Sequence, residues 1–523
     1  MPKPDDDDPS SSLTGGKRLA SNAAWNLAAQ VVPMAVALAT IPLLVRSLGT
    51  DRFGVLTLAW VVLGYFSLFD LGLGRALTKL VAHELGLGRR ERVPALIGTA
   101  LALMTVLGAA GGLAVAVSAV PLTGIVLRIP GPLRHESLLV FYLLAGSLPF
   151  VIATAGLRGV LEAYQEVRAA NVVRTAFGLS THLGPLLVLP FSRSLVPVVA
   201  VLVGCRVALL CVHVVLCARV VPGLRAGAPV RRDLVRPLLG FGGWMTLTSI
   251  INPLMLQADR FLIGALVSTA AVTYYTTPYE AVTKLWALNG ALLGVLFPAF
   301  ATSFVGDRDR TAKIFGRGLK TSFFLVLPPA LLTIGLAPEG LTLWLGPDFA
   351  ARGARVLQLL AAGVFLNSLA QVASALLQGV GRPDLTFKLH LIELPLYLVA
   401  AWALIRGRGI EGAALAWSAR IALDLVLFLW AARRLLPEAS TSVRSVVLGL
   451  VGVTGLMGLV ALPLALGLRI PLLAASFAAS AAIAWNVVLD AGERSGCTAR
   501  LYGVWNHVSR SLGRAGVVGL HGE

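Results

Sequence analysis

Residues Phe241 to Gly264 read FGGWMTLTSIINPLMLQADRFLIG. The run is long enough to cross a bilayer as a helix, which takes about 20 mainly apolar residues, yet it contains Asp259 and Arg260. A charged side chain at membrane depth costs on the order of 2.5–3.5 kcal/mol on insertion scales, so it is rare there without polar surroundings. We therefore expect this helix to line a wet cavity inside a helical bundle. A position at the headgroup level, near a helix end, is the alternative.

The same stretch resembles the first hydrophobic segment of the chain, residues 19–54. Trp25 matches Trp244, and the basic loop at 88–92 matches 306–310 at nearly the same offset, about 219 positions. Each match alone is weak, but together they predict two copies of one helical unit in the same order. Transporters are often built from such repeats, and their substrate site then lies between the repeats.

The composition predicts an all-α membrane protein. Of the 523 residues 57% are hydrophobic and 13% are charged, against roughly 25% charged residues in soluble domains. The mean hydropathy is +0.81. The net charge of +18 is explained by basic loops on the inner side of a membrane. No basic stripe interleaved with aromatic residues indicates a nucleic-acid partner.

Apolar runs bounded by charge, glycine or proline predict about fourteen transmembrane helices. We expect a repeat of two six-helix lobes, followed by two C-terminal helices. The basic tail fits a helix lying on the inner membrane surface, or a frayed terminus. The expected segments are a disordered N-terminus at 1–21, an N-lobe at 22–218, a basic cytoplasmic linker at 219–239, a C-lobe at 240–434, the added helices at 443–490 and the cytoplasmic tail at 491–523.

The distribution of Lys and Arg orients these helices. With the N-terminus inside, the inner segments hold more than twice as many Lys and Arg residues as the outer loops. Basic residues accumulate on the cytoplasmic side of membrane proteins. Both termini are therefore expected in the cytoplasm.

Polar residues recur on one face of the first span and of its counterpart in the second half. Asn22, Asn26 and Gln30 are four residues apart, and Asn252 and Asp259 are seven apart, so each set shares a helix face. Such stripes can join helices by hydrogen bonds. We favour a cavity lining, because the two matching spans both carry one.

Four acidic residues within or beside the spans are candidates for ion coupling. Asp259 lies in the opening stretch, Asp70 precedes a Gly-x-Gly motif, and Glu280 and Glu393 lie within apolar spans. Glu280 also stands four residues before Lys284, as Arg420 does before Asp424, so each pair can form an ion pair along one helix. No convincing metal-ligand spacing is present, and we expect no cofactor.

Deep cations point to an anionic substrate. Arg174, Arg206, Arg260 and Lys320 have no carboxylate four residues away. A guanidinium fork facing a cavity suits a phosphate or diphosphate, which it can grip with two hydrogen bonds. Arg260 ranks first for its polar neighbours and Arg174 second. No glycine-rich loop follows a strand, so a nucleotide-driven mechanism is not expected.

Two stretches resemble bacterial polysaccharide flippases of the multidrug/oligosaccharidyl-lipid/polysaccharide exporter superfamily. They are residues 25–79, with IPLLVRSLGTDRFGVLTLAWVVLGYFSLFDLGLGRALTK, and residues 258–282, ADRFLIGALVSTAAVTYYTTPYEAV. The second departs from the family at Val272-Thr273, where Gly before Tyr is common. The matching positions are Gly49, Phe53, Gly54, Asp70, Gly72, Gly74, Asp259, Gly264 and Tyr274 or Tyr275.

This resemblance implies two facing six-helix lobes that alternate access to a central cavity. The implied substrate is an oligosaccharide on a polyprenyl diphosphate, moved across the bacterial inner membrane for cell-surface polysaccharide biosynthesis. Besides this lipid-linked oligosaccharide, the expected partners are membrane lipids, a polysaccharide polymerase and glycosyltransferases.

Three other functions remain open from the sequence. An ion-coupled drug or metabolite antiporter of the same superfamily would use a carboxylate such as Asp70 or Asp259. A membrane glycosyltransferase or polymerase would need larger acidic outer loops than the short ones near 121–137 and 338–355, so we expect no enzyme. A catalytically silent scaffold that holds a lipid is the third.

Overall fold

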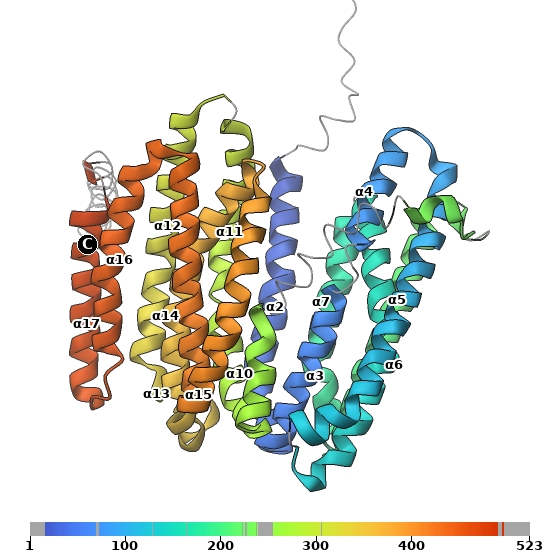
Figure 1. The fold of residues 1–523 in the computed structure, drawn as a ribbon, viewed down its shortest axis with the longest axis horizontal. Helices are drawn as coiled ribbons and strands as arrows, with labels where there is room; N and C mark the ends of the chain where they lie inside the picture. The colour runs from blue at the N-terminus through green and yellow to red at the C-terminus, as the bar shows by residue number, and fades with distance from the viewer. Residues whose placement is uncertain are drawn as a thin grey trace, which may run out of the picture. The chain divides into compact units, whose positions relative to one another are not determined.

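The computed structural model describes residues 16–68, 73–127, 129–164, 166–221, 255–304, 306–489 and 494–495, and parts of 223–238. The described residues form helices and turns, and none of them lies in a strand (Figure 1). The predicted all-α class is therefore confirmed. The α-helices are α2 (Gly16–Leu48), α3 (Thr50–Leu68), α4 (Leu73–Gly86), α5 (Val93–Pro121), α6 (Gly131–Ala163), α7 (Val167–Val188), α8 (Leu195–Val220), a helix at 255–266, α10 (Thr269–Thr283), α11 (Trp286–Ser303), α12 (Arg308–Gly335), α13 (Ala337–Leu345), α14 (Pro347–Gly379), α15 (Pro383–Leu435), α16 (Ser440–Val460) and α17 (Leu466–Ile483).

Nine of the described helical segments are long and apolar enough to cross a membrane: those containing α5, α6, α8, α11, α12, α14, α15, α16 and α17. The chain is thus a multi-pass membrane protein. One of these segments, α15, consists of two helices that meet at a kink at Gly409, where φ is 58° and ψ is −134°, and it therefore covers two of the predicted spans. The part of α2 whose side chains are described, Val32–Leu48, is also apolar.

Contacts between residues divide the chain into two compact units. The first comprises Met1–Lys284, Leu341–Val356 and His390–Trp417, and the second comprises Leu285–Gly340, Leu357–Leu389 and Ser418–Glu523. The first unit therefore contains residues from both predicted repeats. The proposed N-lobe and C-lobe boundaries stay a prediction.

The core of the first unit lies between α4, α5, α6 and α8. Ile97, Met104 and Leu157 are almost completely buried there. Helices α5 and α6 approach closely because small residues face one another: a Cβ atom at Gly112 would lie 2.5 Å from the carbonyl oxygen of Ala145. Small residues allow this approach in membranes, where packing rather than water drives helix association.

Helix α10 packs against α3 within the same unit. The Thr269 hydroxyl donates a hydrogen bond to the Asp51 carboxylate at 2.9 Å, and the Thr273 hydroxyl donates to the carbonyl of Thr50 at 2.7 Å. The backbones touch at Gly54, where an added Cβ would lie 2.0 Å from the carbonyl oxygen of Thr269. This contact joins the second predicted span of each repeat and positions α10.

The second unit has polar contacts inside an apolar core. On α11, the Asn289 amide donates to the carbonyl of Ser368 at 2.9 Å and accepts from the Ser322 hydroxyl at 2.8 Å. Arg420 and Asp424 form a buried ion pair at 2.9 Å along α15, which confirms the pairing expected from their spacing. The charge of Arg420 is thus matched by a side chain one turn away on the same helix.

Candidate functional site

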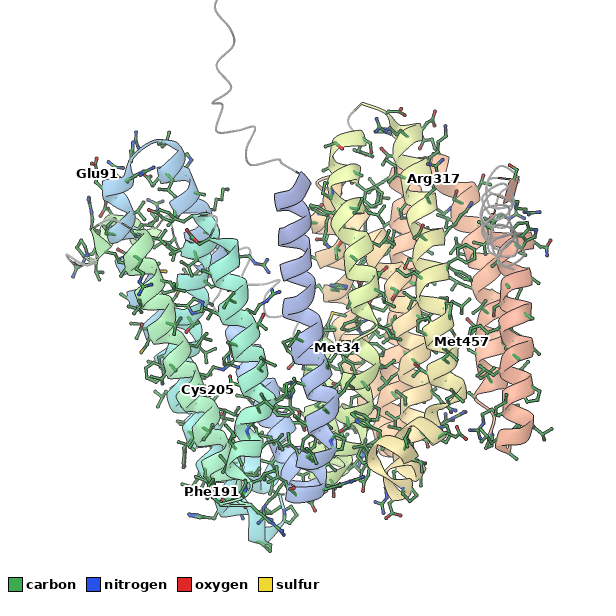
Figure 2. All side chains as sticks on the ribbon, turned by 180° about the vertical axis from the view of Figure 1, so that it is seen from behind. Met34, Glu91, Phe191, Cys205, Arg317 and Met457 are labelled. Atoms are coloured by element: carbon green, nitrogen blue, oxygen red, sulfur yellow. The ribbon has the colours of Figure 1, made fainter. Side chains whose placement is uncertain are left out.

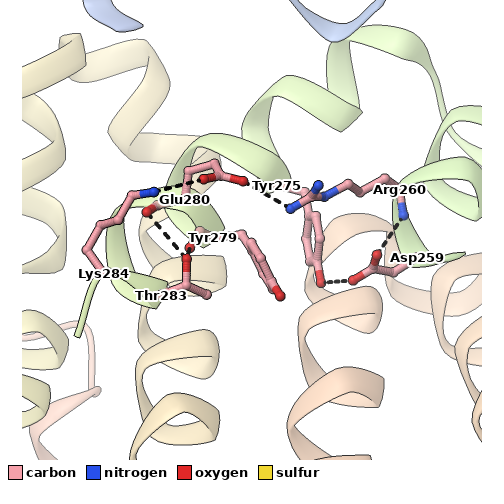
Figure 3. Close-up of polar contacts among 7 residues, drawn as sticks. All are labelled: Asp259, Arg260, Tyr275, Tyr279, Glu280, Thr283 and Lys284. Carbon is pink, nitrogen blue, oxygen red and sulfur yellow. Dashed lines mark hydrogen bonds and ion pairs between the residues drawn. The ribbon is translucent and has the colours of Figure 1, made fainter. Parts of the chain in front are cut away.

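A buried polar cluster lies where the helix at 255–266 meets α10. Asp259 is 0% exposed and Arg260 is 6% exposed. The Asp259 carboxylate accepts hydrogen bonds from the backbone N–H of Arg260, at 2.8 Å, and from the Tyr275 hydroxyl (Figure 3). Both charged residues of the opening stretch are therefore enclosed by protein.

Glu280 connects two cations in this cluster. One carboxylate oxygen accepts from the Arg260 guanidinium at 3.3 Å, and the other lies 3.3 Å from the ammonium group of Lys284 (Figure 3). The predicted pair between Glu280 and Lys284 is confirmed. The side chains of Glu280 and Lys284 are 37% and 31% exposed, so the arrangement is buried at Arg260 and accessible at its other end.

Aromatic rings hold the Arg260 guanidinium in place. Its central carbon lies 4.8 Å from the centre of the Tyr279 ring, and that ring meets Trp417 edge to face at 5.6 Å. A desolvated cation over an aromatic face gains about 2 kcal/mol or more. Tyr279 and Tyr275 are four residues apart, so both project from the same side of α10.

Several buried polar atoms around the cluster have no hydrogen-bond partner among the residues that the structure describes. They are Gln257 Oε1, Arg260 Nε and Thr276 Oγ1, together with Trp60 Nε1 and His182 Nδ1. The rings of Trp60 and His182 lie 5.3 Å apart, on α3 and α7. Buried polar atoms are normally satisfied, so this concentration favours a place where water or a polar ligand binds.

The cluster adjoins an irregular helical turn. Between α10 and α11, backbone hydrogen bonds join residues three apart instead of four. The Lys284 N–H donates to the Ala281 carbonyl at 3.4 Å, and the Leu288 N–H donates to the Leu285 carbonyl at 3.1 Å. Short stretches of this kind inside a long helix often mark a hinge. The chain passes from the first unit to the second at this point, because the first unit ends its long segment at Lys284.

Arg174 lies in a different place from the cluster. It lines a pocket between α6, α7 and α8, together with Arg158 and Arg206. Sequence reasoning placed Arg174 and Arg260 in one cavity, and that remains a prediction, since no described contact joins them.

The other predicted site residues are only partly described. Asp70 and Asn252 lie outside the described residues, and Asn26 and Gln30 lie in the first part of α2, whose side chains are not described. Glu393 lies on α15 and is 1% exposed.

Three participants in the cluster were missed from the sequence. Tyr275 appeared there only as a family-motif position, Tyr279 was not singled out, and Lys284 was considered only as the partner of Glu280. The available signal was the four-residue spacing of Tyr275 and Tyr279 on a helix that also carries Glu280. Such spacing marks a shared face but does not say what that face meets.

Comparison with known proteins gives relatives of two kinds. The protein described as "Putative O-antigen transporter" from Shigella flexneri is 28% identical over 425 residues, which cover 78% of this chain and 96% of that relative. A solved structure of the lipid II flippase MurJ matches with a TM-score of 0.62 at 10% identity, covering 87% of this chain and 96% of that one. A solved structure of an inward-facing multidrug resistance MATE transporter of the MOP superfamily matches with a TM-score of 0.64 at 14% identity, covering 80% of this chain and 99% of that one. These two structures establish the likeness of fold alone.

The family model described as "Polysaccharide biosynthesis protein" matches residues 19–304. This range is more than half of the chain, and it includes Asp259, Arg260 and Glu280. The protein therefore belongs to the polysaccharide biosynthesis protein family.

Proposed function

We propose that this protein is a flippase that moves a polyprenyl-diphosphate-linked oligosaccharide across a membrane by alternating access, for cell-surface polysaccharide biosynthesis. The observation that carries the proposal is the cluster of buried Asp259 and Arg260 with half-buried Glu280 and Lys284, beside an irregular turn, in a family of polysaccharide biosynthesis proteins. The names of the Shigella relative and of the MurJ structure support it.

The cluster can exchange one anion for another. In the structure Glu280 neutralises Arg260 and Lys284 together. A diphosphate offers the same two cations more acceptor oxygens, and guanidinium groups bind such oxygens in pairs. The substrate diphosphate thus displaces Glu280 from the cations, while Asp259 and Tyr275 keep the Arg260 backbone in position. Protonation of the released Glu280 couples this exchange to a proton.

Export in a strain that lacks its own flippase tests the proposal. Arg260→Ala and Asp259→Ala are expected to reduce surface glycan at least tenfold while the protein still inserts. Arg317→Ala, an exposed arginine on α12, serves as the matched control and is expected to export normally. Glu280→Gln is expected to export with a changed pH dependence. Normal glycan export by both Arg260→Ala and Asp259→Ala would remove the cluster from the mechanism.

An ion-coupled antiporter is the second candidate, because the cluster contains two carboxylates and the MATE structure shares the fold. It predicts efflux of small cations that depends on Asp259 and leaves surface glycan unchanged. The excess of cations among the deep charges favours the anionic substrate instead.

The remaining assignments follow from the same proposal. We place the protein in the inner membrane of a bacterium with both termini in the cytoplasm, as the distribution of Lys and Arg favours. It acts as a transporter and not as an enzyme. A polymerase and glycosyltransferases would work on its substrate before and after transport.

A further inference from the structure

A second cationic site lies in the first unit, apart from the Asp259 cluster. The pocket between α6, α7 and α8 has a volume of about 220 Å³ and is lined by Arg158, Arg174 and Arg206, with Phe177 and His213. A water molecule needs roughly 10–15 Å³ of such space. The pocket therefore has room for a group as large as a phosphate ester.

Arg206 occupies an unusual position for a charge. It is near the middle of α8, which runs from Leu195 to Val220, about 21 Å from the Val220 end at 1.5 Å per residue. Its guanidinium lies 4.2 Å from the centre of the Phe177 ring. A stack of this kind holds the cation in a fixed orientation but does not neutralise its charge.

The cations of the pocket outnumber its anions. Arg158 pairs with Glu162 at 3.5 Å, with both side chains about half exposed. Among the described residues, no carboxylate forms an ion pair with Arg174 or Arg206. Arg174 is exposed and Arg206 is half-buried, and both lie within helices of a membrane protein, where a charge faces a partner or water-filled space because an isolated one is costly. An anion from outside the chain satisfies this requirement.

The surroundings of the pocket favour a lipid as the source of that anion. Helix α8 exposes apolar side chains along the same stretch as Arg206: Val207, Val212, Val214 and Val215. Figure 2 labels Cys205, the neighbour of Arg206 on this helix. Acyl chains can lie along this apolar surface while a headgroup enters the pocket.

We propose that the pocket between α6, α7 and α8 binds the phosphate of an anionic phospholipid headgroup. Arg206 and Arg174 hold the phosphate oxygens with charge-assisted hydrogen bonds, and Arg158 lies at the exposed side of the pocket. The site does not depend on the proposed transport function, because its ligand is a membrane lipid and its residues lie outside the Asp259 cluster.

Lipid retention by the purified full-length protein tests this site. The protein is exchanged into mixed micelles that contain equal amounts of phosphatidylglycerol and phosphatidylcholine, and bound lipids are counted by native mass spectrometry. The double variant Arg174→Gln/Arg206→Gln is expected to lower the ratio of retained phosphatidylglycerol to phosphatidylcholine about tenfold, a change of about 1.4 kcal/mol in binding free energy. The double variant Arg317→Gln/Arg444→Gln removes the same charge from exposed positions on α12 and α16 and is expected to keep the ratio.

Two further measurements distinguish a lipid phosphate from inorganic diphosphate, and a loss of binding from a loss of folding. Arg206→Lys keeps the charge and is expected to retain more phosphatidylglycerol than the double glutamine variant, whereas equal loss in both overturns the assignment of guanidinium hydrogen bonds. Inorganic diphosphate is expected to compete only weakly. Unchanged retention in Arg174→Gln/Arg206→Gln, or stabilisation of the protein by inorganic diphosphate but not by phosphatidylglycerol, overturns the proposal. Failure of glycan export in the Arg260→Ala test has no bearing on these measurements.

Discussion

Tyr275 and Asp259 form a hydrogen bond between two buried side chains on neighbouring helices. Tyr275→Phe removes the donor and leaves a buried acceptor with fewer partners, which costs about 1–3 kcal/mol. We therefore expect a lower temperature of thermal unfolding for the purified protein. Tyr274→Phe is the matched control, since Tyr274 packs on Phe349 through its ring and phenylalanine keeps that ring. Equal unfolding temperatures for the two variants would contradict the role of the Tyr275 hydroxyl.

At this same scale, the sequence predicts some contacts of the cluster and not others. Asp259 and Arg260 stand out because they are charges in an apolar run, and the Glu280–Lys284 pair follows from helix geometry alone. The ion pair between Arg260 and Glu280 joins residues 20 positions apart. It depends on how two helices pack, which no local spacing encodes. The same holds for the stacking of Arg206 on Phe177.

Among helices, the contact between α3 and α10 makes the sharpest prediction. Gly54→Ala forces the two backbones apart, although alanine in a helix normally stabilises by about 1 kcal/mol relative to glycine. Cysteines introduced as Asp51→Cys and Thr269→Cys, in a background without native cysteines, are expected to cross-link, and Gly54→Ala should reduce the yield severalfold. Gly146→Ala on α6 meets no atom within 4 Å and should leave it unchanged. If the double-cysteine protein with Gly54→Ala cross-links as well as the one without it, the close approach of the α3 and α10 backbones is not needed for this contact.

Span boundaries show what hydropathy does and does not determine. Two of the spans predicted from hydropathy lie at 384–405 and 411–432, and α15 consists of two helices that meet between these runs, at a kink at Gly409. Hydropathy reports which residues prefer the membrane, but it does not say how far the helices extend beyond the apolar runs toward such a kink. The short helix α13 was missed for the same reason, because its nine residues are too few to form a span.

For the whole molecule, the predicted orientation can be tested directly. Arg193→Cys in the turn between α7 and α8 is expected outside, and Arg231→Cys in the basic linker is expected inside. In a background without native cysteines, a membrane-impermeant maleimide should label the first in intact cells and the second only after permeabilisation. Basic loops stay preferentially in the cytoplasm. The reverse pattern of labelling would contradict the orientation of every span.

The irregular turn at Lys284 has a consequence for how force passes along the chain. Lys284 is both the residue that holds Glu280 and the last residue before the crossing into the second unit. In the proposed exchange, the loss of Glu280 from Lys284 would remove a side-chain contact from a turn whose backbone hydrogen bonds join residues only three apart. Anion binding at Arg260 and bending of the main chain at Lys284 would then depend on the same few residues.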